Sequence, residues 1–119
     1  MTSTPMLAMP NFNDTFIIET DASDDGIGAV LQQQEKPIAY MSRALGITKK
    51  AWSVYNKEML AIVEVIRIQR PYLLGQRFTI QTDHRNIKFF LEQKVTTPEQ
   101  QKWMAKLMGY DYEIIYRSG

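Results

Sequence analysis

The chain has 119 residues, which is enough for one domain around a single hydrophobic core. A hydrophobic fraction of 45% is ordinary for a folded protein, and no apolar run approaches the ~18 residues that indicate a membrane span. Cysteine is absent, which excludes disulfides and thiolate metal sites. Residues 1–13 lack the charged start and apolar stretch of a signal peptide, so we expect an intracellular protein.

The net charge of +1 conceals a division along the chain. Residues 1–35 contain six acids and no Lys or Arg, whereas residues 36–119 contain all fourteen basic residues. The first third is therefore suited to attracting cations and the rest to attracting phosphates. Chance clustering of solvated surface charge is the alternative interpretation.

The first part of the chain predicts an arm followed by three strands. Residues 1–13 show no regular period, and we interpret them as a linker from an upstream segment, with one domain over residues 14–119. Residues 14–21 alternate between apolar and polar side chains, as strands do. After a turn at residues 23–26, residues 27–33 and 36–41 predict two further strands of an antiparallel meander.

The second part predicts helices and two more strands. Residues 49–74 form the clearest helical pattern, with Pro71 and Gly75 expected to end it. Its apolar stripe recurs at spacings of three and four, at Trp52, Tyr55, Met59, Ile62 and Ile66. The later elements are, in order, a strand at 77–83, a short helix at 86–93, a helix that starts at 97–99 and continues over 100–108, and a strand at 111–116.

Two of the predicted strands end in the same dipeptide, Thr20-Asp21 and Thr82-Asp83. A long helix lies between them in sequence. If that helix is a right-handed crossover, the first and fourth strands are parallel neighbours. Asp21 and Asp83 would then emerge at the carboxyl edge of the sheet, where open α/β sheets place ligands.

Glu58 is a third acid, and the helical wheel places it close to the apolar stripe. A carboxylate near the core is costly without a cation. Three convergent acids suit hard divalent ions such as Mg²⁺, and two such ions can assist phosphodiester cleavage. Taken singly, each Asp is also typical of a turn. Glu58 taken singly is also typical of an acid on a helix surface that forms a salt bridge with Arg or Lys. His84 is either a metal ligand or proton carrier or simply a strand-end residue.

Around these acids the sequence closely resembles the ribonuclease H domain of gypsy-type LTR retrotransposon reverse transcriptases. The resemblance covers about residues 5–119 and joins many short motifs. These are residues 16–23, 26–31, 37–42, 55–63, 72–75, 82–84, 96–98, 101–103 and 109–112.

The resemblance implies a ribonuclease H-like α/β fold: a mixed five-stranded sheet, antiparallel meander plus parallel strands, with flanking helices. It implies endonucleolytic cleavage of the RNA strand of RNA/DNA hybrids with two Mg²⁺ or Mn²⁺ ions, held by Asp21, Glu58 and Asp83. By position, Ser23, Tyr55 and Asn86 are expected to contact the hybrid. The implied partners are the hybrid and the polymerase domain of the same polyprotein. The implied location is cytoplasmic, in a virus-like particle, or nuclear.

The sequence departs from the family at its end. Relatives continue past the last strand into a C-terminal helix that carries a fourth acid, whereas this chain stops at Gly119. We therefore expect a domain truncated after the last strand, with that helix missing and a face open to self-association or another partner. The alternative function is a weak or inactive ribonuclease H-like module that acts in protein binding. A structural spacer is a third interpretation, disfavoured by the three acids.

Several basic and aromatic residues are candidates for contacting nucleic acid, because hybrid affinity comes mainly from phosphates. The basic candidates are Lys49, Lys50, Lys57, Arg85 and Lys88. Trp52 and Trp103 are candidates for stacking on bases, and their alternative role is in the core or at a helix cap.

Overall fold

The computed structural model describes residues 9–11, 13–23, 25–83, 87–88 and 98–117. Five strands and four helices with defined bounds follow one another along the chain. In order these are β1 (Phe16–Ala22), β2 (Gly26–Gln33), β3 (Lys36–Ala44), α1 (Ile47–Lys50), α2 (Val54–Ile68), α3 (Arg70–Leu73), β4 (Arg77–Thr82), α5 (Pro98–Lys106) and β5 (Asp111–Tyr116).

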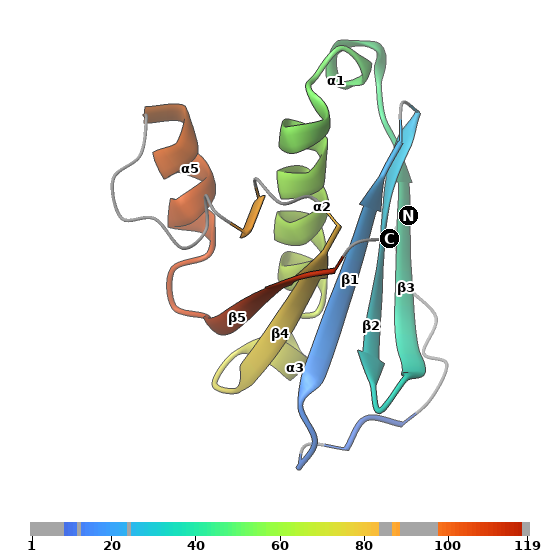
Figure 1. The fold of residues 1–119 in the computed structure, drawn as a ribbon, viewed down its shortest axis with the longest axis vertical. Coiled ribbons are helices and arrows are strands. Elements are labelled where there is room, and N and C mark those ends of the chain that lie inside the picture. The colour runs from blue at the N-terminus through green and yellow to red at the C-terminus, as the bar shows by residue number, and fades with distance from the viewer. Residues whose placement is uncertain (1–8, 12, 24, 84–86, 89–97, 118–119) are drawn as a thin grey trace.

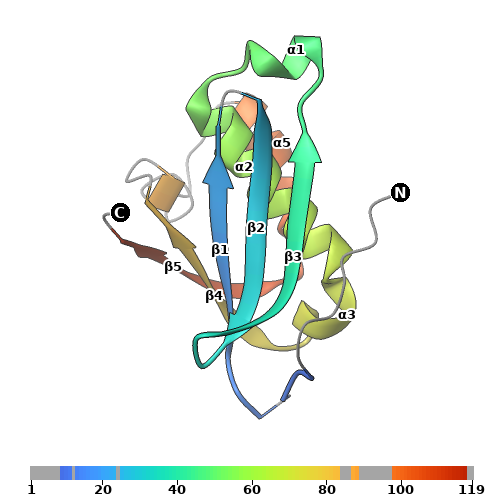
Figure 2. The same ribbon diagram turned by 90° about the vertical axis from the view of Figure 1, so that its right-hand side faces the viewer.

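The five strands form one mixed sheet in the order β3-β2-β1-β4-β5 (Figure 1). The first three strands are an antiparallel meander, whereas β4 runs parallel to β1 and β5 runs parallel to β4. Figure 2 views the meander with α2 and α5 behind it, so these helices cover one face of the sheet. The predicted ribonuclease H-like architecture, a mixed five-stranded sheet with flanking helices, is confirmed.

Helix α2 provides the helical side of the hydrophobic core. Ser53 caps its start, since the serine side chain accepts a hydrogen bond from the backbone N–H of Asn56. Apolar residues of α2 pack on the inward side chains of the central strands, and burial of this kind is the main force that stabilises a fold. Among them, Met59 and Ile62 on α2 and Phe16 and Ile18 on β1 are fully buried.

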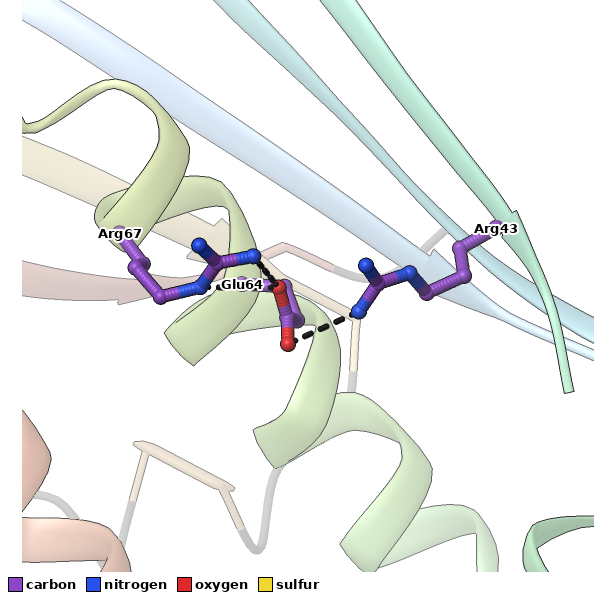
Figure 3. A network of polar contacts seen from close by, with 3 residues as sticks. All are labelled: Arg43, Glu64 and Arg67. Atoms are coloured by element: carbon purple, nitrogen blue, oxygen red, sulfur yellow. Dashed lines mark hydrogen bonds and ion pairs between the residues drawn. The ribbon is translucent and has the colours of Figure 1, made fainter. Parts of the chain in front are cut away.

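An ion-pair network ties the outer strand of the meander to α2 (Figure 3). Arg43 on β3 lies 3.0 Å from one carboxylate oxygen of Glu64 on α2. Arg67, one turn further along the helix, lies 2.7 Å from the other oxygen. The Glu64 side chain is only 15% exposed, so this contact bridges two elements where water has limited access.

The β2–β3 hairpin has a two-residue turn whose backbone is unusual for its sequence. Gln34 and Glu35 both have positive φ, 49° and 65°, a geometry that favours Asn-Gly in such turns. Next to the turn, the Gln33 amide donates to the backbone oxygens of Asn11 and Asp14 and accepts from the Asn11 N–H. The buried Gln33 thus fixes the chain just before β1.

The single helix predicted over residues 49–74 is wrong, because the segment divides into α1, α2 and α3. Ser53 is extended and caps a new helix, which separates α1 from α2. Pro71 has no N–H to continue α2, but it is tolerated in the first turn of α3, so it begins a helix rather than ending one. Gly75, with a φ of 85°, follows α3 as expected.

The remaining element boundaries differ less. Strand β3 continues to Ala44, three residues beyond the prediction, whereas α5 begins at Pro98, within the predicted helix start at residues 97–99. Of the helix predicted at 86–93, only residues 87–88 are among those described, and both are helical. Within the described ranges, no helix combines the length and apolar character needed to cross a membrane.

Candidate active site

The carboxyl ends of the three parallel strands meet at one edge of the sheet. Because β1, β4 and β5 run in the same direction, their last residues lie side by side. A hollow of 470 Å³ opens there. Its lining residues come from these three strand ends: Glu19, Thr20, Asp21, Gln81, Thr82, Asp83 and Arg117.

Glu58 reaches the same edge from α2. Its carboxylate accepts a hydrogen bond from the Thr20 hydroxyl, with 3.0 Å between the two oxygens. Both residues are buried, and Glu58 is only 2% exposed. The predicted position of Glu58, on the core side of the helix and close to the end of β1, is therefore confirmed, and the surface-acid alternative is wrong.

The surroundings of Glu58 disfavour its charged form. Burial raises the pKa of the carboxyl group above its usual value, and the negative charges of Asp83 and Asp21 raise it further. The hydrogen bond from Thr20 acts in the opposite direction and only partly offsets these effects. Glu58 therefore lies within electrostatic range of both aspartates, in a place that favours a cation or a proton.

The two aspartates differ in exposure from the threonines that precede them. Thr20 and Thr82 are buried on the side of α2, whereas Asp21 and Asp83 are exposed. Asp21 is the penultimate residue of β1 and pairs with Gly28 of β2, so it lies at the carboxyl end of the strand as predicted. In the part of the chain that the structure describes, no three Asp, Glu or His side chains form a ready-made metal site.

The three residues predicted to contact substrate lie in different settings. Ser23 is exposed directly after β1, where its hydroxyl and backbone N–H both bond to the carbonyl oxygen of Gly26. Tyr55 lies in the first turn of α2, partly buried against the core. Asn86 lies outside the described residues, as do His84 and Arg85.

Among the basic candidates, Lys57 is only 3% exposed, so its prediction as a surface phosphate contact is wrong. Trp52 and Trp103 contact each other edge to face, with 6.2 Å between ring centroids. The Lys49 ammonium lies 5.8 Å from the Trp52 ring centroid. Both indole rings are partly buried against the core, which favours their packing role over base stacking.

Two residues of the site were not singled out from the sequence. Thr20 was visible only as the partner of Asp21 in a repeated dipeptide, and alternation along β1 already put it on the buried face. Arg117 follows β5 as Asp83 follows β4. That equivalence becomes visible only once β5 is known to run parallel beside β4.

The donor set of this site fits a hard divalent cation. Asp21, Glu58 and Asp83 offer only carboxylate oxygens, which Mg²⁺ prefers. The Glu58 carboxylate is buried close to two further negative charges. Chemically, such a site is suited to cation-assisted reactions of phosphate esters.

Residues 11–110 match the family described as the RNase H-like domain found in reverse transcriptase. Over 115 residues the chain is 36% identical to the Pol polyprotein of transposon 297 from Drosophila melanogaster, which covers 97% of this chain and 11% of the polyprotein. The Pol polyprotein of transposon opus, from the same organism, is 38% identical over 122 residues, covering 98% of this chain and 12% of that one. The chain thus spans about a tenth of these relatives.

Solved structures share the fold. The foamy viral protease-reverse transcriptase in complex with dsDNA superimposes with a TM-score of 0.76 at 16% identity, over 93% of this chain and 25% of that one. LC11-RNase H1 in complex with RNA/DNA hybrid gives a TM-score of 0.58 at 20% identity, over 87% of this chain and 86% of that one.

Proposed function

The chain belongs to the family of RNase H-like domains found in the reverse transcriptases of retrotransposon Pol polyproteins, and from that premise we propose that it cleaves the RNA strand of RNA/DNA hybrids. One observation carries the proposal: a buried glutamate, Glu58, bonds to the end of β1 and lies within electrostatic range of Asp21 and Asp83. A fold alone supports many activities, so the proposal depends on this site rather than on the architecture.

RNase H-like domains generally use divalent metal ions. Here Asp21, Glu58 and Asp83 would hold Mg²⁺ or Mn²⁺. When bound, a pair of such ions supplies activation of an attacking water and stabilisation of the leaving oxygen. Glu58 contributes a carboxylate that Thr20 orients, and the aspartates contribute exposed oxygens from the lining of the hollow.

The substrate class follows from the relatives and from the chemistry. LC11-RNase H1, which shares the fold, is described in complex with RNA/DNA hybrid. Selection of the RNA strand requires recognition of the 2′-hydroxyl, and we assign this to Ser23, Tyr55 and Asn86 by their sequence positions. Ser23 is exposed and directly follows Ala22, the last residue of β1.

The wider context is part of the same proposal. We propose a gypsy-type parent element, a polymerase domain in the same polyprotein, and residues 1–13 as the segment that joins the two. The protein would act where reverse transcription occurs, in a cytoplasmic virus-like particle or in the nucleus. Self-association and a non-catalytic binding role are the competing hypothesis.

A gel assay with a labelled RNA/DNA hybrid tests the activity. The chain should cut the RNA strand in Mg²⁺ or Mn²⁺ and not in EDTA. Asp21→Asn and Asp83→Asn should each reduce cleavage at least a hundredfold, because each removes a charged metal ligand while conserving size. Circular dichroism should show that both variants remain folded, since both side chains are exposed.

Asp111→Asn is the matched control, because Asp111 lies at the opposite end of the sheet and pairs with Arg77. It should cut at the wild-type rate. Hybrid binding without cutting in either metal would favour the binding-module hypothesis, and wild-type cleavage by Asp21→Asn would overturn the site.

A further inference from the structure

The acidic hollow contains one cationic side chain whose role the proposed metal site does not explain. Its lining combines three carboxylates, Glu19, Asp21 and Asp83, with the guanidinium of Arg117. Phosphodiesters are anions, so a hollow lined by carboxylates alone would repel the backbone of a nucleic acid. A cationic side chain in the lining reduces this repulsion in its neighbourhood.

The parallel strands explain why Arg117 lies there. The ladders pair Glu19 with Gln81 and Gln81 with Ile115. The β4–β5 ladder reaches Thr82, so Asp83 and Arg117 follow side by side, whereas the β1–β4 ladder ends two residues before Asp21 and Asp83. In Figure 1 the end of β5 lies beside the end of β4.

The backbone of Arg117 is fixed, while its side chain is loosely held. Its N–H donates to the carbonyl oxygen of Thr82 at 2.9 Å. One guanidinium nitrogen donates to the side-chain oxygen of Gln81 at 3.4 Å, which is long for a hydrogen bond. Across the residues that the structure places, the guanidinium forms no ion pair with the acids of the hollow. Among the described residues, most of its five donors therefore have no partner.

Resting on the proposed function, we infer that Arg117 binds a backbone phosphate of the RNA/DNA hybrid beside the cleaved bond. The guanidinium fork matches two phosphate oxygens, and such charge-assisted contacts are strong. The weak bond to Gln81 is readily exchanged for a phosphate. Arg117 thereby positions the strand against Asp21 and Asp83, and its backbone anchor keeps the arginine at the edge of the site.

Hybrid binding measured by fluorescence anisotropy tests the inference, with Ca²⁺ replacing Mg²⁺ to prevent cleavage. Arg117→Gln should weaken binding roughly tenfold at 0.1 M salt, as expected for loss of one charge-assisted contact. The slope of log Kd against log salt should fall by about one unit, because one fewer counterion is released. Arg117→Lys should retain the slope and lose part of the affinity, because it keeps the charge without the fork.

Arg70→Gln is the control, since Arg70 is an exposed arginine on α3 that lines a different hollow. It should change neither affinity nor slope. If Arg117→Gln binds with the wild-type affinity and slope, or only lowers the melting temperature, the inference is wrong and the proposed function survives. If the wild-type chain does not bind the hybrid, both are wrong.

Discussion

At the scale of single residues, the bond between Thr20 and Glu58 controls the charge at the centre of the site. The hydroxyl donates to the buried carboxylate, whose pKa is raised by burial and by the two aspartates. A carboxyl group whose folded pKa lies above its unfolded value favours folding at low pH. That contribution is fully present below the unfolded value near 4.5 and is lost as pH rises through the folded pKa.

Thr20→Val tests this balance, because valine conserves the shape and removes the donor. We expect a loss of about 1–3 kcal/mol in the free energy of unfolding at pH 7 and a smaller loss at pH 4, because the hydrogen bond stabilises the charged form of Glu58 and that form becomes less populated as the pH falls. Urea denaturation at both pH values measures it. Thr79→Val is the control, since Thr79 is as buried as Thr20, at 9% exposed. Equal pH dependence in the two variants would contradict the role of the Thr20 hydrogen bond in stabilising charged Glu58.

At the scale of elements, Glu64 holds β3 against α2 (Figure 3). Burial opposes ionisation of Glu64, but the hydrogen bond from Arg67 and the charges of Arg43 and Arg67 outweigh it and lower the pKa. The pKa shift of Glu64 is therefore opposite in direction to that of Glu58. Glu64 stabilises the fold above its unfolded pKa near 4.5, and this contribution disappears as pH falls through the lower folded value.

Glu64→Gln should therefore cost roughly 0.5–1 kcal/mol of unfolding free energy at pH 7, a modest value because both arginines are partly solvated. The cost should decline as the pH is lowered below 4.5. Chemical denaturation across this range measures it. Glu113→Gln serves as the control, because Glu113 is exposed on β5. A Glu64 effect that does not change with pH would argue for packing rather than charge.

At the scale of the whole molecule, the site joins elements that are distant in sequence: β1, α2 and the residue after β4. A cation bound across all three would stabilise the folded state, because the unfolded chain cannot assemble the ligands. This provides a test of metal binding that does not depend on cleavage.

We expect 10 mM Mg²⁺ to stabilise the wild-type chain by on the order of 1 kcal/mol, equivalent to a few degrees in melting temperature. Differential scanning fluorimetry at constant ionic strength measures the shift. The double variant Asp21→Asn, Asp83→Asn should show no such shift. An equal shift in both proteins would mean that Mg²⁺ acts elsewhere on the surface.

Local patterns predicted most of the elements. Alternation along residues 14–21 predicted the buried face of β1, including Thr20, because strand side chains alternate strictly. The helical period placed Glu58 beside the apolar stripe of its helix, and this position predicted its burial. Apolar residues over residues 49–74 keep their helical spacing across the helix boundaries at Ser53 and Pro71. Their pattern therefore predicted one helix where the structure has three.

The sequence by itself predicted the order of strands and helices, because periodicity is a local signal, and it singled out three acids as candidate ligands; the mixed five-stranded sheet was implied by the family resemblance. Only the tertiary structure decided that Glu58 bonds to Thr20 while Asp21 and Asp83 remain exposed at the same edge. Likewise, only the pairing of β5 beside β4 brought Arg117 to the same edge. The reason is that strand order and side-chain contact depend on residues far apart in the chain, which no local pattern records.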